Sequence, residues 1–273
     1  MRLSIVNFLG VLFSLGILVF GITETIGVTN FLANIPIFTS SVFVSVPSLI
    51  IVMGGILNAI FITYQPKYVG QAFLSIFYLF SQSKTSSRTL ENDMGEIVIW
   101  NDQIKSDRVK ALGQLEDQHT GEVAGYLFSL MSTNYKNDEI KEFGSNHIEE
   151  QYFRKLVVVD VLRQMGGAAP SFGMFGTLFG LIVMLGSLED PSGMGPGLAA
   201  ALITTLYGIS LARFIFYPVA EKLKNSAQMN RFREYFILEG ILLINEKKSS
   251  FYIQDKMSTY LRRDFKENKQ SEK

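Results

Sequence analysis

The fold is decided by residues Met165–Leu223, MGGAAPSFGMFGTLFGLIVMLGSLEDPSGMGPGLAAALITTLYGISLARFIFYPVAEKL, in which one short acidic loop separates two apolar stretches. The first stretch, residues 164–188, and the second, residues 191–212, contain no charged side chain. Each reaches the roughly 20 residues that a helix needs to cross the hydrocarbon core of a bilayer. The two stretches therefore predict two membrane-spanning helices joined by a tight external turn.

Two more charge-free stretches precede this region, at residues 3–23 and 25–66. The second is about twice the spanning length, so we expect an external segment followed by a helix over residues 42–63. With a mean hydropathy of +0.22, the composition also favours a membrane protein. The predicted fold class is an all-α integral membrane protein with four transmembrane helices and a cytoplasmic helical domain.

The distribution of Lys and Arg predicts the orientation, because short loops rich in these residues stay in the cytoplasm. The segment 28–41 has no charged residue and the segment 187–197 has only Glu189 and Asp190, so both are expected outside. Both termini are then cytoplasmic. The predicted divisions are residues 1–66, the first two spans with their uncharged external loop; 67–163, a cytoplasmic helical domain; 164–218, the last two spans; and 219–273, a cytoplasmic helix and tail.

Several classes of function are disfavoured. The chain has no Cys, and its two His residues, His119 and His147, are too isolated to form a zinc motif. The glycines of the last external loop lack the strand, turn and helix that a nucleotide site requires. We therefore expect neither an enzyme nor a resident cofactor, and no nucleic-acid partner.

The predicted spans contain no ionisable residue in their interior. Arg213 lies near the cytoplasmic end of the fourth span, and Glu24 lies at the external end of the first. Proteins that conduct ions normally mark the path with such a residue, because burying it in lipid is costly. The chain therefore either does not conduct, or it takes an acid from another protein.

Small residues at helical spacing line the last two spans. In the third span Gly176 and Gly180 form a small-xxx-small pair, and in the fourth Gly197, Ala201, Thr204 or Thr205, Gly208 and Ala212 follow one another. Such surfaces allow two helices to approach closely. For any single glycine, ordinary helix packing is the favoured explanation over a functional role.

Three residues of these spans are candidates for an ion pathway. Pro170 removes a backbone donor and leaves the carbonyl of Gly166 without its helical partner, which indicates either a kink or a helix-starting proline. Thr177 and Thr205 offer neutral hydroxyl ligands for a transient hard cation. Alternatively, each threonine bonds to a carbonyl of its own helix.

Three segments resemble the flagellar stator A subunits of the MotA/PomA family, particularly the sodium-driven type. They are Met165–Leu223, Pro47–Phe61 (PSLIIVMGGILNAIF) and Asp107–Asp117 (DRVKALGQLED). The resemblance implies a homo-pentamer in the bacterial inner membrane. The ring would surround a dimer of a MotB/PomB-like B subunit, whose membrane aspartate carries the ion. The first loop and the last thirty or so residues depart from the family pattern.

The resemblance also assigns residues. The family's two prolines fall on Pro170 and Pro218, and its third-span and fourth-span threonines fall on Thr177 and Thr205. Proton-driven relatives lack the third-span threonine. The pair of hydroxyls thus implies transient Na⁺ binding, with H⁺ as the alternative ion.

The resemblance places a rotor contact on the segment 107–117. A basic residue followed eight positions later by an acid fits Arg108 and Glu116, and Asp117 extends the acidic end. Val109 stands where a second basic residue is common in the family. These residues would touch the switch-ring protein of the rotor. The alternative is a solvated helix face of little energetic weight.

The function expected from this resemblance is a stator subunit that conducts ions with a B subunit and transmits torque to the flagellar rotor. Two alternatives stay open. One is a related ion-driven motor unit with a non-flagellar load. The other is a non-conducting membrane scaffold, in which the small residues merely assemble a ring.

Overall fold

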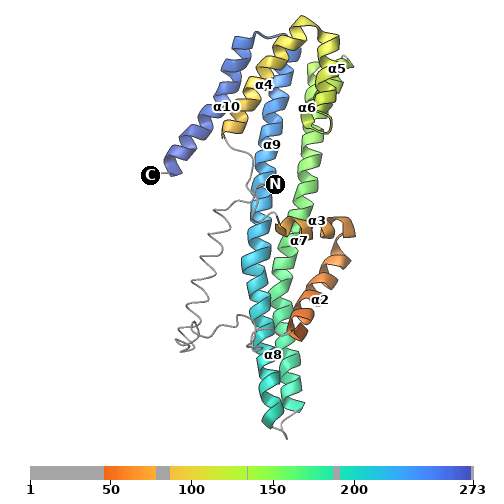
Figure 1. Cartoon of the computed structure of the whole chain (residues 1–273), viewed down its shortest axis with the longest axis vertical. Coiled ribbons are helices and arrows are strands. Elements are labelled where there is room, and N and C mark those ends of the chain that lie inside the picture. Colours follow the sequence, from red (N-terminus) through yellow and green to blue (C-terminus); the bar gives the residue numbers. More distant parts are fainter. Residues whose placement is uncertain (1–45, 78–86, 134, 187–190, 272–273) are drawn as a thin grey trace, which may run out of the picture. The chain divides into compact units, whose positions relative to one another are not determined.

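The computed structural model describes residues 46–77, 87–133, 135–186 and 191–271. Within these ranges every regular element is a helix (Figure 1). The elements are α2 (Val46–Thr63), α3 (Pro66–Ile76), α4 (Ser87–Ser106), α5 (Arg108–Gln118), α6 (Val123–Ser132), α7 (Asn137–Gly186), α8 (Pro191–Ser210), the π-helix η3 (Leu211–Phe216), α9 (Tyr217–Asn245) and α10 (Ser250–Ser271). The all-α prediction is confirmed for this part of the chain.

Among the described residues, two helices are long and apolar enough to cross a membrane: α7, with 50 residues, and the continuous helical run Gly197–Asn245, with 49. They contain the predicted third and fourth spans. The predicted second span matches a shorter apolar helix, Ser48–Thr63. The predicted first span, the whole first external loop, residues 42–45 of the predicted second span and residues 187–190 of the second loop lie outside the described residues, so the four-span topology stays a prediction.

The chain forms two compact units. Unit 1 comprises residues 1–82 and 157–223, and unit 2 comprises residues 83–156 and 224–273. Helices α7 and α9 contribute residues to both. The predicted division of the chain into membrane and cytoplasmic segments uses other boundaries than these two units, and it stays a prediction.

In unit 1, helices α2 and α3 pack against α7, η3 and the start of α9. Their common core is made of aliphatic and aromatic side chains, among them Val52, Ile56 and Ile60 of α2, Val159 and Leu162 of α7, and Phe216 of η3. Helix α3 begins with Pro66 in its first turn, where a missing N–H costs nothing. It buries Val69, Ala72 and Ser75, three residues apart, which is the one-sided pattern of a surface helix.

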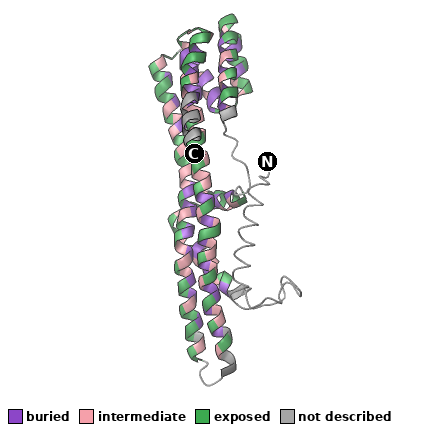
Figure 2. Ribbon diagram, turned by 90° about the vertical axis from the view of Figure 1, so that its left-hand side faces the viewer, coloured by how far each residue is buried: buried purple, intermediate pink, exposed green. Residues whose placement is uncertain are grey.

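In unit 2, short helices surround the N-terminal part of α7 and the C-terminal part of α9. The core holds Trp100 of α4, Leu127 and Phe128 of α6, Phe236 and Ile241 of α9, and Ile253 and Met257 of α10. Buried residues recur along each of these helices, with exposed residues between them (Figure 2). Trp100 is the only tryptophan of the chain and is 5% exposed, so its fluorescence reports on this unit.

Candidate functional site

Glycines bring α7 and α8 into backbone contact. Gly173, Gly176 and Gly180 face α8, and all three are buried. A Cβ atom at Gly180 would lie 2.8 Å from the backbone nitrogen of Ala201 and 2.8 Å from the carbonyl oxygen of Gly197. No side chain fits at such a distance. The small-residue pattern therefore serves close packing between these two helices, as expected for helices in lipid.

Two neighbouring threonines of α8 use their hydroxyls differently. Thr204 is buried, and its hydroxyl donates to the carbonyl oxygen of Ala201 in its own helix at 2.8 Å. The hydroxyl of Thr205 instead donates across the interface to the carbonyl oxygen of Gly173 in α7 at 3.4 Å. The alternative that each candidate threonine bonds to its own helix thus holds for Thr177, whose hydroxyl donates to Met174 of α7, and fails for Thr205.

The Gly173 carbonyl also links Thr205 to the other predicted threonine. In an α-helix the carbonyl of residue 173 accepts from the N–H of Thr177, one turn along. The hydroxyl of Thr177 donates to the carbonyl oxygen of Met174 at 2.6 Å. Thr205 therefore contacts the turn of α7 that ends at Thr177, whereas the Thr177 hydroxyl itself bonds within α7.

Neutral oxygens alone do not complete a cation site, because a hard cation with so few ligands keeps much of its hydration. Residues 164–188 and 191–212 hold no carboxylate. Among the described residues, no group of three or more His, Cys, Asp or Glu side chains is placed to hold a metal ion. These two apolar segments therefore offer Thr177 and Thr205 no charged ligand of their own.

The two candidate prolines sit in different helical settings. Pro170 lies in the interior of α7, which continues on both sides of it, so the interpretation of a helix-starting proline is wrong. Pro218 is the second residue of α9 and is separated from the π-helix η3 by Tyr217 alone. The π-helix itself was not expected from the charge-free length of the fourth span.

The predicted rotor-contact residues lie on α5. Asp107 caps this helix by accepting from the backbone N–H of Lys110 at 3.3 Å. Arg108 is half-buried, and its guanidinium donates to the side-chain oxygen of Asn245 at 2.9 Å. Glu116 is half-buried and Asp117 is exposed. The Arg108 side chain is thus bonded to α9. Glu116, eight residues later, is not its hydrogen-bond partner.

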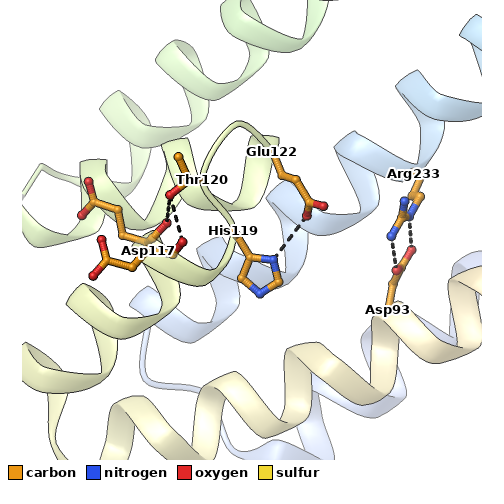
Figure 3. A network of polar contacts seen from close by, with 7 residues as sticks. Asp93, Asp117, His119, Thr120, Glu122 and Arg233 are labelled. Atoms are coloured by element: carbon orange, nitrogen blue, oxygen red, sulfur yellow. Dashed lines mark hydrogen bonds and ion pairs between the residues drawn. The ribbon is translucent and has the colours of Figure 1, made fainter.

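The turn after α5 fixes the acidic end of that helix (Figure 3). The hydroxyl of Thr120 donates to the carbonyl oxygens of Glu116, at 3.2 Å, and Asp117, at 2.9 Å. The ring nitrogen Nδ1 of His119 lies 3.2 Å from a carboxylate oxygen of Glu122. These bonds tie down the last turn of α5, where helix carbonyls otherwise lack donors.

An ion pair joins α4 to α9 in unit 2. Arg233 donates through two nitrogens to the two carboxylate oxygens of Asp93, at 2.6 and 2.7 Å (Figure 3). The side chain of Asp93 is only 4% exposed, whereas that of Arg233 is 38% exposed. The paired geometry compensates the carboxylate for its loss of water.

A second charged cluster joins α7 to α9. Arg231 and Tyr235 both donate to one carboxylate oxygen of Glu149, and the Arg231 guanidinium lies 4.7 Å from the ring centre of Tyr152. Burial alone would raise the pKa of Glu149, but the hydrogen bonds from Tyr235 and Arg231 outweigh it, and the net pKa is lowered. The carboxylate therefore stays charged and holds the two helices together.

Comparison with known proteins decides the family. Residues 116–234 match the MotA/TolQ/ExbB proton channel family. The chemotaxis protein PomA of Vibrio alginolyticus is 30% identical over 219 residues, which cover 80% of this chain and 85% of that protein. The chain belongs to the MotA/PomA family. The resemblance inferred from the three quoted segments is confirmed.

Other members of the family show the same extent of similarity. Motility protein A of Aquifex aeolicus is 30% identical over 221 residues, 80% of this chain and 86% of that protein. The C. jejuni MotAB structure matches with a TM-score of 0.76 and 20% identity over 94% of this chain and 95% of that one. The flagellar MotAB stator complex of Bacillus subtilis matches with a TM-score of 0.72 and 21% identity, over 90% and 94%. The fold is thus that of the MotA subunits.

Proposed function

We propose that the chain is the A subunit of an ion-driven flagellar stator that conducts Na⁺ with a B subunit and transmits torque to the rotor. Membership in the MotA/PomA family supports the class of machine. The observation that carries the ion pathway is the Thr205 hydroxyl bonded to the Gly173 carbonyl, one turn from Thr177. An uncharged hydroxyl at this helix interface supports a path for a cation, with an acid supplied by the partner.

The partner and the stoichiometry of the stator are those that the family resemblance implies, and the partner supplies the carboxylate that residues 164–188 and 191–212 lack. A MotB/PomB-like subunit supplies a membrane aspartate, and five copies of this chain surround two copies of that partner. All four spans cross the bacterial inner membrane, and both termini are cytoplasmic. The structures of MotAB complexes similar to this chain support a partner of this type.

The mechanism couples ion binding to movement of α7 against α8. A cation on the partner's aspartate is also bound by the oxygens near Thr177 and Thr205, and its release changes which copy of this chain the aspartate prefers. Because Gly173, Gly176 and Gly180 carry no side chains at the interface, the two helices are able to slide by small steps. Pro170 and Pro218 lie on the cytoplasmic side of this interface.

Torque leaves the chain through α5 in unit 2. Arg108 is oriented by Asn245, and the last turn with Glu116 and Asp117 is fixed by Thr120. Asn245 holds the Arg108 guanidinium directly, whereas Thr120 holds the backbone of the turn that carries the Glu116 and Asp117 carboxylates. The switch-ring protein of the rotor is the partner of this surface.

A sodium series tests the proposal. Swimming speed is measured in a strain that lacks this gene and carries it back with its B-type partner, at fixed pH. Speed that rises with sodium supports the sodium-driven stator. Speed that ignores sodium but is lost with a protonophore replaces Na⁺ by H⁺, and unchanged swimming in the deletion strain rules out the flagellar load in favour of another load or a scaffold.

A further inference from the structure

A π-helical turn separates the membrane helix α8 from α9. It comprises Leu211–Phe216, and the N–H of Tyr217 donates to the carbonyl oxygen of Ala212, five residues back. Turns of this kind are rare and cluster at functional sites. This one lies where the predicted fourth span ends.

The sequence explains why the helix widens here. Pro218 has no N–H, and in a regular α-helix its ring would collide with the carbonyl of Phe214. In addition, every fourth residue is buried: Thr204, Gly208, Ala212, Phe216 and Ala220. In a regular α-helix, the four intervals from Thr204 to Ala220 would rotate these residues by about 160° around the helix axis. The π turn contains an extra residue, so more of these buried residues stay on the same face of the helix.

Tyr217, at the end of the turn, lies against a glycine of α7. A Cβ atom at Gly166 would lie 3.0 Å from the Cε1 and Cζ atoms of the Tyr217 ring. At Gly167 a Cβ atom would lie 3.9 Å from the Tyr217 hydroxyl, an ordinary contact. The guanidinium of Arg213 lies 5.6 Å from the ring centre on the same helical run. The Tyr217 ring thus packs against Gly166, in space that a side chain at residue 166 would otherwise need.

We propose that Tyr217 is a positioning residue, whose ring on Gly166 couples the π turn of η3 to the segment of α7 that precedes Pro170. Gly166 is the residue whose carbonyl loses its helical donor at Pro170, so both proline-weakened segments meet at this contact. A shift of the π turn changes the register of α9 relative to α8, and the ring transmits that shift to α7. The inference rests on the proposed function, because it gives this contact a place in the conduction cycle.

Torque per stator unit tests the inference in the assembled motor. The height of single steps is recorded as units join a motor one at a time, at saturating sodium and over a sodium series. We expect Tyr217→Ala and Gly166→Ala to lose most of the step height, with an unchanged sodium concentration for half-maximal speed. Tyr217→Phe keeps the aromatic ring and should have the step height of the wild type. Gly167→Ala is the matched control and should resemble the wild type.

A merely structural role would instead lower the number of steps and leave their height intact, and this outcome would overturn the inference. Equal loss of step height in Gly166→Ala and Gly167→Ala would also overturn it. If Tyr217→Ala fails to accumulate in membranes, Gly166→Ala and Tyr217→Phe decide the question, because both keep an aromatic ring at residue 217.

Amide hydrogen exchange on the purified full chain in nanodiscs gives a readout that is independent of the motor. We expect faster exchange at residues 211–217 and at 166–170 in Tyr217→Ala, and wild-type exchange in Tyr217→Phe. If the wild-type chain drives no motor, the proposed function fails, and this exchange result alone decides the coupling. Faster exchange confined to one of the two segments would show that the ring does not couple them.

Discussion

The hydroxyl of Thr205 on α8 bonds to the carbonyl oxygen of Gly173 on α7, 3.4 Å away and 32 residues earlier in the chain. This contact crosses the interface on which the proposed ion path depends. Its neighbour Thr204 bonds within its own helix, so the two adjacent hydroxyls are chemically distinct. The distinction leads to the first prediction.

We expect Thr205→Ala to abolish sodium-driven swimming, because it removes the hydroxyl from the interface. Thr205→Ser keeps the hydroxyl and should retain most of the speed while raising the sodium concentration required. Thr204→Ser serves as a control, since its own-helix bond is preserved. The measurement is swimming speed against sodium with membrane levels of the chain checked in parallel. Normal swimming of Thr205→Ala would contradict the assignment.

The glycine contacts predict a steric effect at one position of α7 and none at another. Gly180→Ala places a methyl group 2.8 Å from backbone atoms of α8, so it should destabilise the packed helices by about 1–3 kcal/mol. Gly186→Ala in the same helix meets no atom within 4 Å and is the matched control. Thermal stability of the full chain in detergent should fall for the first variant only. Similar melting temperatures for the two would show that the interface tolerates separation.

The buried carboxylate of Asp93 predicts a large effect on unit 2. Arg233→Gln leaves this 4% exposed carboxylate without its cation and should lower the free energy of unfolding by about 3 kcal/mol. Arg154→Gln breaks an ion pair with Glu150 whose side chains are 65% and 49% exposed, and should change it by less than about 1 kcal/mol. Trp100 fluorescence during denaturation reports both. Equal losses of unfolding free energy in Arg233→Gln and Arg154→Gln would mean that burial does not determine how much each ion pair stabilises the unit.

The raised pKa of Glu234 in α9 predicts how the stability of unit 2 changes with pH. Burial raises its pKa above 4.5, although Lys155, 3.9 Å away, and Arg233 favour the charged form. The folded state therefore holds the proton more tightly than the unfolded state, so the charged form costs stability above the folded pKa, and this cost disappears as the pH falls toward 4.5. Glu234→Gln should stabilise unit 2 at neutral pH.

The measurement for Glu234→Gln is Trp100-detected unfolding between pH 4.5 and 8. The gain over the wild type should shrink as the pH falls. Glu239→Gln, which removes a pair with Lys256 of similar length, 3.8 Å, is the control. A gain that is constant with pH would show that the Glu234 carboxylate carries no desolvation cost.

Arg108 predicts a defect in torque without a defect in ion flow. Arg108→Ala removes the charge that Asn245 orients, so torque per unit should fall while conduction with the partner persists. Lys110→Ala, in the same helix and exposed, is the control and should have a smaller effect. Single-motor recordings give the torque, and sodium uptake by cells that produce this chain with its B-type partner gives the conduction. Loss of conduction in Arg108→Ala would move this residue from the rotor contact to the ion pathway.

The sequence alone determined the helical class, the third and fourth apolar segments and the family. These depend on local quantities: the length of charge-free runs, the four-residue spacing of glycines and the motif at Met165–Leu223. It also named Thr177 and Thr205 as a pair. The spacing of small residues was readable because packing in lipid requires close approach along one face.

Only the tertiary structure decided which of two adjacent threonines crosses the interface, and that Arg108 contacts Asn245 instead of pairing with Glu116. These contacts join residues 32 and 137 positions apart, and no local pattern encodes such distances. The π turn is an intermediate case. Pro218, which contributes to the turn, is present in the sequence. The burial of every fourth residue, and the choice between widening and breaking the helix, depend on packing, including that of Phe216 and Tyr217 against their neighbours.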